Sequence, residues 1–303
     1  YYLKLVLDSQ YQNVATSKCI EAMMRSKMLK YCYIYGIIDS YSLCNETVVY
    51  MALAIGKADG PFIDCPNLRH LDVSGALPRL SNRTNKIKQL RFSVMNNVYS
   101  INFTNMIHSL IQLETLFISN FTGVTELDIQ NSTLITITLS AMFKISQIEF
   151  NTPQLVTAQL PRCYQLTSIS WGNKPMMNMR TLDINGNSCI GDKGLNLTTS
   201  KVFPFPNLVN LGLASTCISI KTLNIIKENC NSLRKVDVSK IKTIQHKDRQ
   251  KMRYKLTGRR GVRDEIPRIE SLLHCHEYNS HMRDVKDSLS HPKIGTFEIN
   301  ARY

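Results

Sequence analysis

One short pattern of apolar residues recurs through most of the chain and limits the folds open to it. The pattern is an apolar residue, two variable residues, an apolar residue, one variable residue and a third apolar residue. It occurs eleven times, first as Leu68/Leu71/Val73 and last as Leu233/Val236/Val238. Side chains two apart on a strand point to the same side, so the last two apolar residues face one core. A single copy cannot bury them, and the pattern therefore predicts the stacked coils of a solenoid.

The spacing of the pattern divides this solenoid. Between Leu116 and Ile169 its middle position returns every 10 to 11 residues. A leucine-rich coil needs at least about 20 residues, so two neighbouring copies must share one coil, with one strand on each side. A flat, mostly β section is expected from about Thr115 to Trp171. Which strand of each pair faces the concave side stays open.

The later copies are longer. The middle positions Leu182 and Leu211 are 29 residues apart, and Leu211 and Val236 are 25 apart. The insert from Ser219 to Asn229 carries apolar residues at near-helical spacing, which predicts a helix on the convex side.

Four segments resemble leucine-rich repeats: CPNLRHLDVSG from Cys65, MRTLDINGN from Met179, FPNLVNLGL from Phe205 and CNSLRKVDVSK from Cys230. Cys65, Cys163 and Cys230 each stand three residues before the first repeat position. The segment SCIGDKGLNL is similar to the D-x-G-L that opens helices in the cysteine-containing, ribonuclease-inhibitor-like branch, which is found in F-box leucine-rich-repeat proteins. The resemblance covers roughly residues 61–240. At the asparagine-ladder position of the family only Asn187 matches, and Ala76, Ser132, Cys163 and Thr216 stand there in other copies.

This resemblance implies an α/β solenoid, namely a leucine-rich-repeat horseshoe with a β-rich short-repeat middle and helical longer repeats toward the C-terminus. Residues 1–60 are expected to form a degenerate N-terminal repeat or cap, with a helix from Ser17 to Lys30. Residues 61–240 form the solenoid. Residues 241–303 form a basic C-terminal cap or tail, with a helix from Thr243 to Leu256. Caps are expected because the open ends of a solenoid must be covered.

The chain has a formal net charge of +14, and part of it is concentrated near the C-terminus. This basic patch has eight members beside one acid, Asp248: Lys247, Arg249, Lys251, Arg253, Lys255, Arg259, Arg260 and Arg263. Such a field favours an acidic partner, such as nucleic acid, an anionic membrane surface or an acidic protein face. The alternative is a solubilising end segment.

Motifs for catalysis are missing from the sequence: there is no GxSxG, P-loop, GxGxxG after a strand or HExxH. We therefore expect no enzyme activity, no catalytic residues and no cofactor. The densest group of metal-capable side chains is His274, Cys275, His276, Glu277 and His281. No second ligand pair of familiar spacing follows it, so we interpret it as a polar surface cluster and expect no metal.

The compartment is suggested by the nine cysteines, which contain no CxxC pair and favour a reducing, intracellular location. Six N-x-S/T sequons, which begin at Asn45, Asn82, Asn102, Asn120, Asn131 and Asn196, are the features that would suit a secreted ectodomain instead. No apolar run reaches the roughly 18 residues of a transmembrane helix.

Solvent-facing strand positions are where leucine-rich repeats usually bind. We expect partner contacts at nine such positions: His70, Asp72, Arg91, Phe117, Glu126, Asp128, Glu149, Asp183 and Asp237. The hypothesis that fits best is a non-catalytic protein-binding scaffold or adaptor of an intracellular assembly. One alternative is a component of a nucleoprotein complex that uses the basic patch. Another is the substrate-binding part of an F-box-type ubiquitin-ligase adaptor, which needs an F-box segment upstream.

Overall fold

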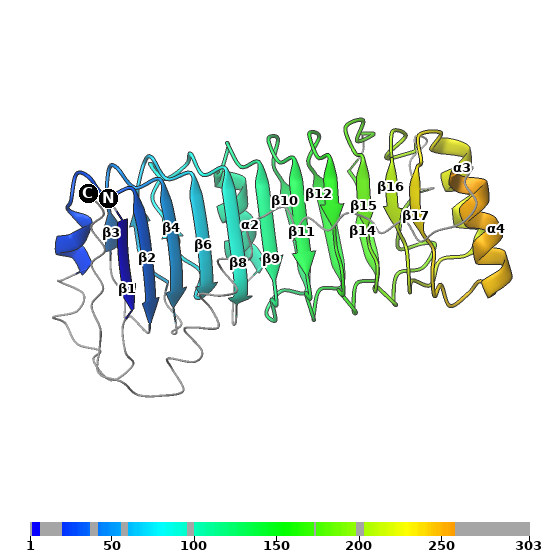
Figure 1. Ribbon diagram of the computed structural model, residues 1–303, viewed down its shortest axis with the longest axis horizontal. Helices are drawn as coiled ribbons and strands as arrows, with labels where there is room; N and C mark the ends of the chain where they lie inside the picture. Colours follow the sequence, from blue (N-terminus) through cyan, green and yellow to red (C-terminus); the bar gives the residue numbers. More distant parts are fainter. Residues whose placement is uncertain are drawn as a thin grey trace.

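The computed structural model describes residues 2–6, 20–36, 42–55, 60–95, 100–172, 174–197 and 203–257. These residues form a parallel β-solenoid whose strands lie side by side along a nearly straight row (Figure 1). The main sheet of the described chain has eleven parallel strands in chain order. They are β1 (Tyr2–Val6), β2 (Tyr31–Gly36), β4 (Tyr50–Ile55), β6 (His70–Gly75), β8 (Gln89–Met95), β9 (Thr115–Ser119), β11 (Thr136–Ser140), β13 (Thr157–Gln159), β15 (Thr181–Asp183), β16 (Asn210–Gly212) and β17 (Lys235–Asp237).

The second side of the coils carries two smaller parallel sheets. One contains β3 (Ser42–Cys44), β5 (Phe62–Asp64) and β7 (Arg79–Leu80), and the other contains β10 (Glu126–Gln130), β12 (Gln147–Asn151) and β14 (Ser168–Ser170). Helix α2 (Ser100–Ser109) comes between these groups in the chain and packs against β10. The prediction of two strands per coil between Thr115 and Trp171 is confirmed, and the same arrangement also occurs at β3–β5–β7.

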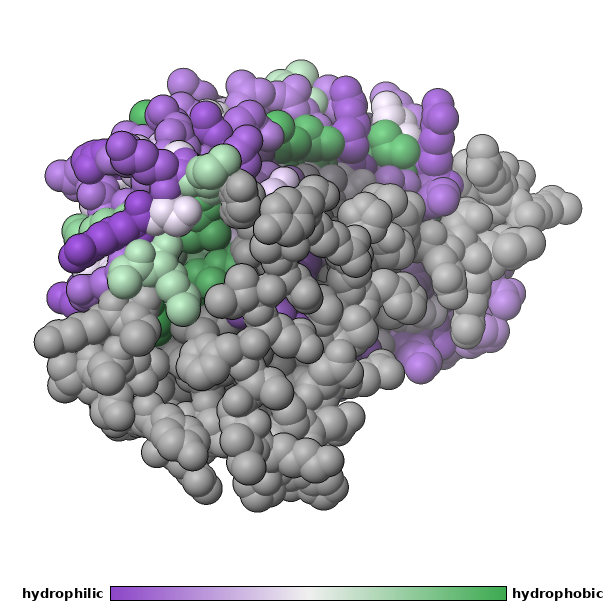
Figure 2. Space-filling model, turned by 60° about the vertical axis from the view of Figure 1, so that its left-hand side comes forward, coloured by the Kyte–Doolittle hydropathy of each residue, from purple (hydrophilic) through white to green (hydrophobic). Residues whose placement is uncertain are grey.

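The core runs between the two sides. All the apolar residues of the eleven repeat copies are buried, and none of them is more than 6% exposed. Full burial of one such side chain contributes about 1.5–3 kcal/mol, and each coil gains it only against its neighbours. Aromatic rings fill the wider parts of the core, where Phe150 stacks on Trp171 with ring centroids 5.3 Å apart. Hydrophilic residues cover most of the described surface that faces the viewer in Figure 2.

The expected α/β horseshoe with helical later repeats is wrong. The insert at Ser219–Asn229 does form a helix, α3 (Ile220–Asn229), which Ser219 caps by accepting a hydrogen bond from the Lys221 amide. The segment SCIGDKGLNL, however, forms turns and an isolated bridge between Gly191 and Cys217. A Cβ on Gly194 would lie 2.0 Å from the carbonyl oxygen of Thr167, so the coils are too close here for a helix.

The physical reason is the width of the elements. A helix with its side chains is about 10–12 Å wide, whereas neighbouring strands lie about 4.8 Å apart. Helices on one side of every coil would spread that side and bend the stack into a horseshoe. In most of the described coils both sides are strands or turns, so the two sides have similar spacing and the row stays nearly straight (Figure 1).

The N-terminal strands extend this core, and a C-terminal helix covers its other end. Strands β1, β2 and β4, from residues 1–60, join the main sheet in register, with Tyr2 beside Tyr31 and Tyr31 beside Tyr50. The predicted helix from Ser17 to Lys30 is observed only over residues 20–24, and Ser17 lies outside the described residues. At the other end, α4 (His246–Thr257) matches the predicted helix and covers the last coil, where its Met252 is buried. Arg249 fixes α4 by donating to the carbonyl oxygens of Ile241 and Ile244.

Asparagine side chains hold the turns after several strands. Asn187 donates to the carbonyl oxygens of Leu160 and Ile184 and accepts from the amide of Cys163, so it links two adjacent coils. Asn45 and Asn131 make equivalent bonds on the second side, where each accepts from the amide two residues later. Both are buried. The repeat-based alignment missed both positions, because Asn131 lies one residue before the expected position at Ser132 and Asn45 lies before the first of the eleven copies.

The repeat cysteines are also structural. The thiols of Cys65, Cys163 and Cys230 donate to carbonyl oxygens of the preceding coil: those of Leu43, Leu139 and Phe205, at 3.4–3.5 Å. Burial raises the pKa of all three thiols to about 12. These residues are therefore held as neutral thiols that bridge adjacent coils.

Candidate interaction surface

The nine predicted strand-face residues lie on two different sides of the solenoid. Three of them, Glu126 and Asp128 on β10 and Glu149 on β12, lie on the second side. The other six lie on the main sheet: His70, Asp72, Arg91, Phe117, Asp183 and Asp237. The structure therefore does not bring the nine residues into one site.

On the main sheet, three of these residues form a row in register. Asp72 lies beside Arg91, and Arg91 lies beside Phe117. The guanidinium carbon of Arg91 is 4.5 Å from the ring centroid of Phe117, which is a cation–π contact. Burial raises the pKa of the Asp72 carboxyl to about 6, and the positive charge of Arg91 opposes part of that rise.

Two further acids of the main sheet serve the fold. Asp183 accepts a hydrogen bond from the amide of Asn185 at 3.0 Å, and Asp237 accepts one from the amide of Ser239 at 2.9 Å. Each bond closes the turn that follows its strand. These carboxylates are consequently less available to a partner than the strand pattern suggests.

The second side offers a more open surface over β10, β12 and β14. We call it the acidic strand surface, and it consists of Glu126, Asp128, Gln147, Glu149, Ser168 and Ser170. Glu126, Gln147 and Ser168 form one row in register, and Asp128, Glu149 and Ser170 form a second row two residues further along. Alternation along each strand turns these side chains to solvent while Leu127, Ile148 and Ile169 face the core.

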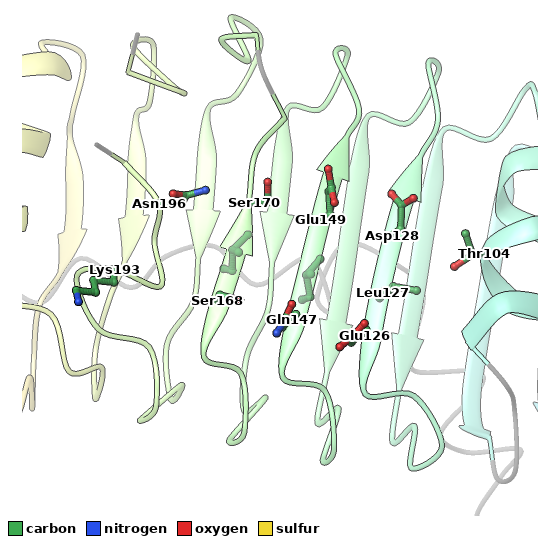
Figure 3. Close-up of a pocket in the computed structure, with 12 residues that line it drawn as sticks. Thr104, Glu126, Leu127, Asp128, Gln147, Glu149, Ser168, Ser170, Lys193 and Asn196 are labelled. Carbon is green, nitrogen blue, oxygen red and sulfur yellow. The ribbon is translucent and has the colours of Figure 1, made fainter. Parts of the chain in front are cut away.

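This surface lies in a shallow depression of about 510 Å³ (Figure 3). Thr104 of α2 lines it at one end, and Lys193 and Asn196 line it at the other. Glu126 and Glu149 are exposed, and Asp128 is partly buried. The depression is wide and polar, which suits contact with a macromolecular surface better than enclosure of a small molecule.

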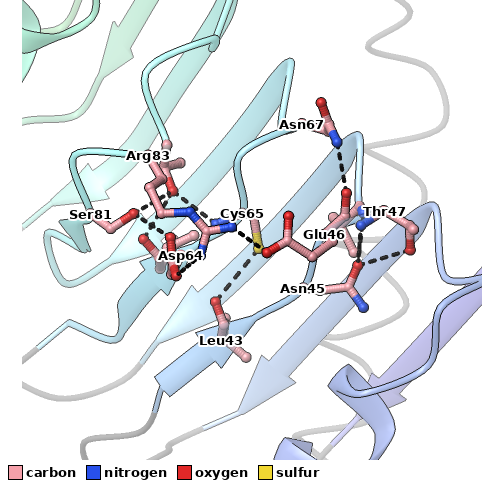
Figure 4. A network of polar contacts seen from close by, with 12 residues as sticks. Leu43, Asn45, Glu46, Thr47, Asp64, Cys65, Asn67, Ser81 and Arg83 are labelled. Atoms are coloured by element: carbon pink, nitrogen blue, oxygen red, sulfur yellow. Dashed lines mark hydrogen bonds and ion pairs between the residues drawn. The ribbon is translucent and has the colours of Figure 1, made fainter.

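In the other second-side sheet, β3–β5–β7, an arginine neutralises the acidic side chains. Around β5 and β7, Arg83 forms ion pairs with both Glu46 and Asp64, and its nitrogen lies 3.0 Å from Asp64 (Figure 4). Ser81 also donates to Asp64 at 2.6 Å. One arginine thus links the carboxylates of two successive coils.

The part of the chain that the structure describes shows no such pairing on the acidic strand surface. Among the described residues, no ion pair joins Glu126, Asp128 or Glu149 to a cation. One oxygen of Asp128, Oδ2, accepts from the side-chain amide of Gln130 at 2.7 Å. Its other oxygen, Oδ1, is buried and has no hydrogen-bond partner within the described chain. Buried polar atoms are nearly always hydrogen-bonded, so this oxygen is an exception within the described chain.

Neither a metal site nor a membrane-spanning helix is present among the described residues. In that part of the chain, no three His, Cys, Asp or Glu side chains are grouped so that they could bind a metal ion. The histidine group from His274 to His281 lies outside the described residues. No helix of the described chain is both long and apolar enough to cross a bilayer.

The predicted basic patch is described only in part. Lys247 and Lys251 are exposed on α4, whereas Arg249 is engaged with the preceding turn. Arg253 and Lys255 belong to α4, but their side chains lie outside the described set. Arg259, Arg260 and Arg263 also lie outside the described residues.

Several residues of the surface were not predicted, although the sequence contained a signal for some of them. Ser168 and Ser170 occupy the variable positions of the copy Leu166/Ile169/Trp171, so the same pattern could have identified them. Helix α2 could have been predicted from Phe103, Met106, Ile107 and Leu110, which are three and four residues apart and all buried. Lys193 has no comparable signal, because a turn from the next coil places it at the depression.

The chain matches no protein-family model and shows no significant similarity to any curated protein sequence. The fold and the surface described above are therefore the basis for any functional assignment.

Proposed function

We propose that this chain is a non-catalytic protein-binding scaffold, and that its acidic strand surface binds a basic patch on a partner protein. The observation that carries the proposal is the set of three carboxylates, Glu126, Asp128 and Glu149, without a cationic partner among the described residues. Complementary charge gives such a contact its specificity and speeds association.

The solenoid supports this role because it fixes the carboxylates on a rigid parallel ladder. The spacing of their backbones is set by hydrogen bonds between β10, β12 and β14, so little backbone conformational entropy is lost on binding. A lysine or arginine of the partner would pair with the exposed carboxylates of Glu126 and Glu149. Within a protein–protein contact of ordinary size, such a desolvated pair belongs to the residues that dominate affinity.

The test is an affinity pull-down with mass spectrometry at low and at high salt, repeated with charge-reversed variants. We expect the double variant Glu126→Lys/Glu149→Lys to lose the partners that the unmodified chain retains. Glu228→Lys is the matched control, since Glu228 is an exposed acid on α3, away from the surface. Retention of the same partners by the double variant would refute this assignment.

A second candidate function rests on α4, where the exposed Lys247 and Lys251 face solvent. This helix would contact phosphate groups within a nucleoprotein complex, as the charge of the sequence suggests. Binding of RNA or DNA that falls steeply with salt, and that is reduced when both lysines become alanine, would favour this candidate.

The finer classification is also a proposal. The repeat motifs and the bonded Asn187 support membership of the leucine-rich-repeat superfamily, in the cysteine-containing branch, and an F-box-type adaptor role would follow from that branch. An intracellular location is also part of the proposal. Of the six sequons, Asn82 is exposed, whereas Asn45 and Asn131 are buried. The side-chain amides of both sequon asparagines donate to backbone carbonyl oxygens in buried turns, where a glycan cannot be accommodated.

A further inference from the structure

We propose that the main sheet has a second binding site, an aromatic platform that binds single-stranded nucleic acid. The aromatic platform consists of Tyr31, Tyr33, Tyr50 and His70, which come from the neighbouring strands β2, β4 and β6. It lies on the opposite side of the core from the acidic strand surface, so this site goes beyond the scaffold function proposed above.

Three rings of the platform contact one another across the strands, and Tyr31 lies beside Tyr50 in register. Tyr31, Tyr50 and His70 are in register. The ring centroids of Tyr33 and Tyr50 are 5.2 Å apart at an interplanar angle of 32°, and those of Tyr50 and His70 are 6.2 Å apart at 29°. His70 also shares a hydrogen bond with Gln89, 3.1 Å away on β8. Tyr31, at one side of the row, is an exposed large residue with 48% of its surface accessible.

Core packing does not explain these rings. Along β2 and β4, the core positions are Cys32, Ile34, Met51 and Leu53, and all are buried. Tyr31 and Tyr50 occupy alternate positions in a row where later strands carry threonine: Thr115, Thr136, Thr157 and Thr181 follow His70 and Gln89. The aromatic residues are thus concentrated at one end of a row that is otherwise small and polar.

Cationic residues adjoin the platform. Lys30 is exposed immediately before Tyr31, and Arg69 immediately precedes His70. Lys4 lies beside Tyr33 in register on β1. The acid that shares the Tyr33 row is Asp72, which is buried beside Arg91. Three cations therefore adjoin the platform, against one acid that is buried.

Aromatic rings that stack on bases, combined with cations that follow the phosphates, are the features by which proteins bind single strands without strict sequence preference. A duplex hides its base faces and cannot use the rings in this way. Proline-rich peptides instead bind grooves between aromatic side chains. Here Tyr33, Tyr50 and His70 contact one another and Tyr31 is exposed beside them, which favours a flat ligand that stacks on the exposed ring.

The test is fluorescence anisotropy with labelled oligouridine of about eight nucleotides, a length within the usual site sizes. The matched ligand is an abasic strand of equal length, which keeps the phosphates and lacks the bases. We expect the full chain to bind oligouridine about tenfold or more tightly than the abasic strand, since each stacked base contributes to affinity. Binding through the basic patch alone would not distinguish the two ligands.

Variants assign the preference to the platform. Tyr31→Leu keeps an apolar side chain of similar bulk and is expected to remove most of the preference for bases, whereas Tyr31→Phe keeps the ring and is expected to retain it. The double variant Lys247→Ala/Lys251→Ala is expected to lower the affinity for oligouridine and for the abasic strand by the same factor. Equal affinity for oligouridine and the abasic strand, or a preference that survives Tyr31→Leu, would overturn the proposal. Binding of a proline-rich peptide without oligouridine binding would also overturn it. Glu126→Lys/Glu149→Lys tests the opposite side independently.

Discussion

Asn131 joins the end of α2 to the turn after β10, and its removal tests the second-side asparagine ladder. The side chain is 7% exposed. Its amide donates to the carbonyl oxygens of Ile107 and Leu110 at 3.3 and 3.0 Å. Its oxygen accepts from the backbone amide and the hydroxyl of Thr133, both at 3.0 Å. Four hydrogen bonds therefore depend on one side chain.

The expected cost of Asn131→Ala follows from what each partner retains. The carbonyl oxygens of Ile107 and Leu110 keep backbone donors, from Leu110 and Leu113 respectively. The hydroxyl of Thr133 keeps the carbonyl oxygen of Leu113. The backbone amide of Thr133 loses its partner. With about 0.5–1.5 kcal/mol for each lost bond, and more for the orphaned amide, the loss in unfolding free energy is about 2–4 kcal/mol.

The assay is urea unfolding followed by circular dichroism, with Asn82→Ala as the control. Asn82 also begins a sequon, but it is exposed, so its replacement should change the unfolding free energy by less than about 0.5 kcal/mol. Asn131→Asp should cost at least as much as Asn131→Ala at neutral pH, because a carboxylate has no donor for the two carbonyl oxygens. If Asn131→Ala and Asn82→Ala unfold at the same urea concentration, the ladder assignment is wrong.

Three further predictions concern the main sheet, the coil packing and the thiols. Because burial raises the folded-state pKa of Asp72 to about 6, from an ordinary value of 3.8, the folded chain holds a proton that the unfolded chain releases between about pH 4 and pH 6. The free energy of unfolding should therefore fall as pH rises through that window. The variant Asp72→Asn should raise the free energy of unfolding by up to about 3 kcal/mol at pH 7.5 and by almost nothing at pH 4. Urea unfolding at both pH values measures this difference. Gly194→Ala should lower the thermal midpoint through an overpacking cost of about 1–3 kcal/mol, whereas Gly191→Ala, whose Cβ meets Cys217 at 3.6 Å, should change it little. In the native chain a thiol reagent should modify the exposed Cys44 and Cys189 and spare the buried Cys65 and Cys163, as peptide mapping would show; early labelling of Cys65 would contradict the bridging role.

The repeat positions could be predicted from the sequence because burial of three apolar residues in each coil is a local pattern with a fixed spacing. Copies such as Leu116/Ile118 and Ile148/Phe150 gave both the strands and their inward faces. Their 10- to 11-residue spacing was also enough to place strands on both sides of a coil. The side on which each strand lies was not determined, because both sides share one core and use the same apolar spacing.

The helices and the candidate site were less predictable, because they depend on contacts between coils and not on a local pattern. The D-x-G-L segment has the residues of a helix start, yet Gly194 packs against Thr167 of the preceding coil and leaves room only for turns. The predicted strand-face residues included acids from both sides of the solenoid. Alternation of apolar and polar residues separates core-facing from solvent-facing positions, but it does not show on which side of the solenoid a strand lies. Asp183 and Asp237 were included for the same reason, although each closes its own turn.

The two proposed sites are compatible because of how α2 divides the second side. That helix separates β3–β5–β7, where Arg83 neutralises the acids, from β10–β12–β14, where the described carboxylates stay unpaired. The main sheet is not interrupted there, since β8 and β9 pair directly across the same point. A ligand on Tyr31 and Tyr50 and a basic partner on Glu126 and Glu149 would therefore contact opposite sides of one rigid core. Binding at one site should leave the affinity at the other nearly unchanged, whereas strong coupling would require a second arrangement of the coils.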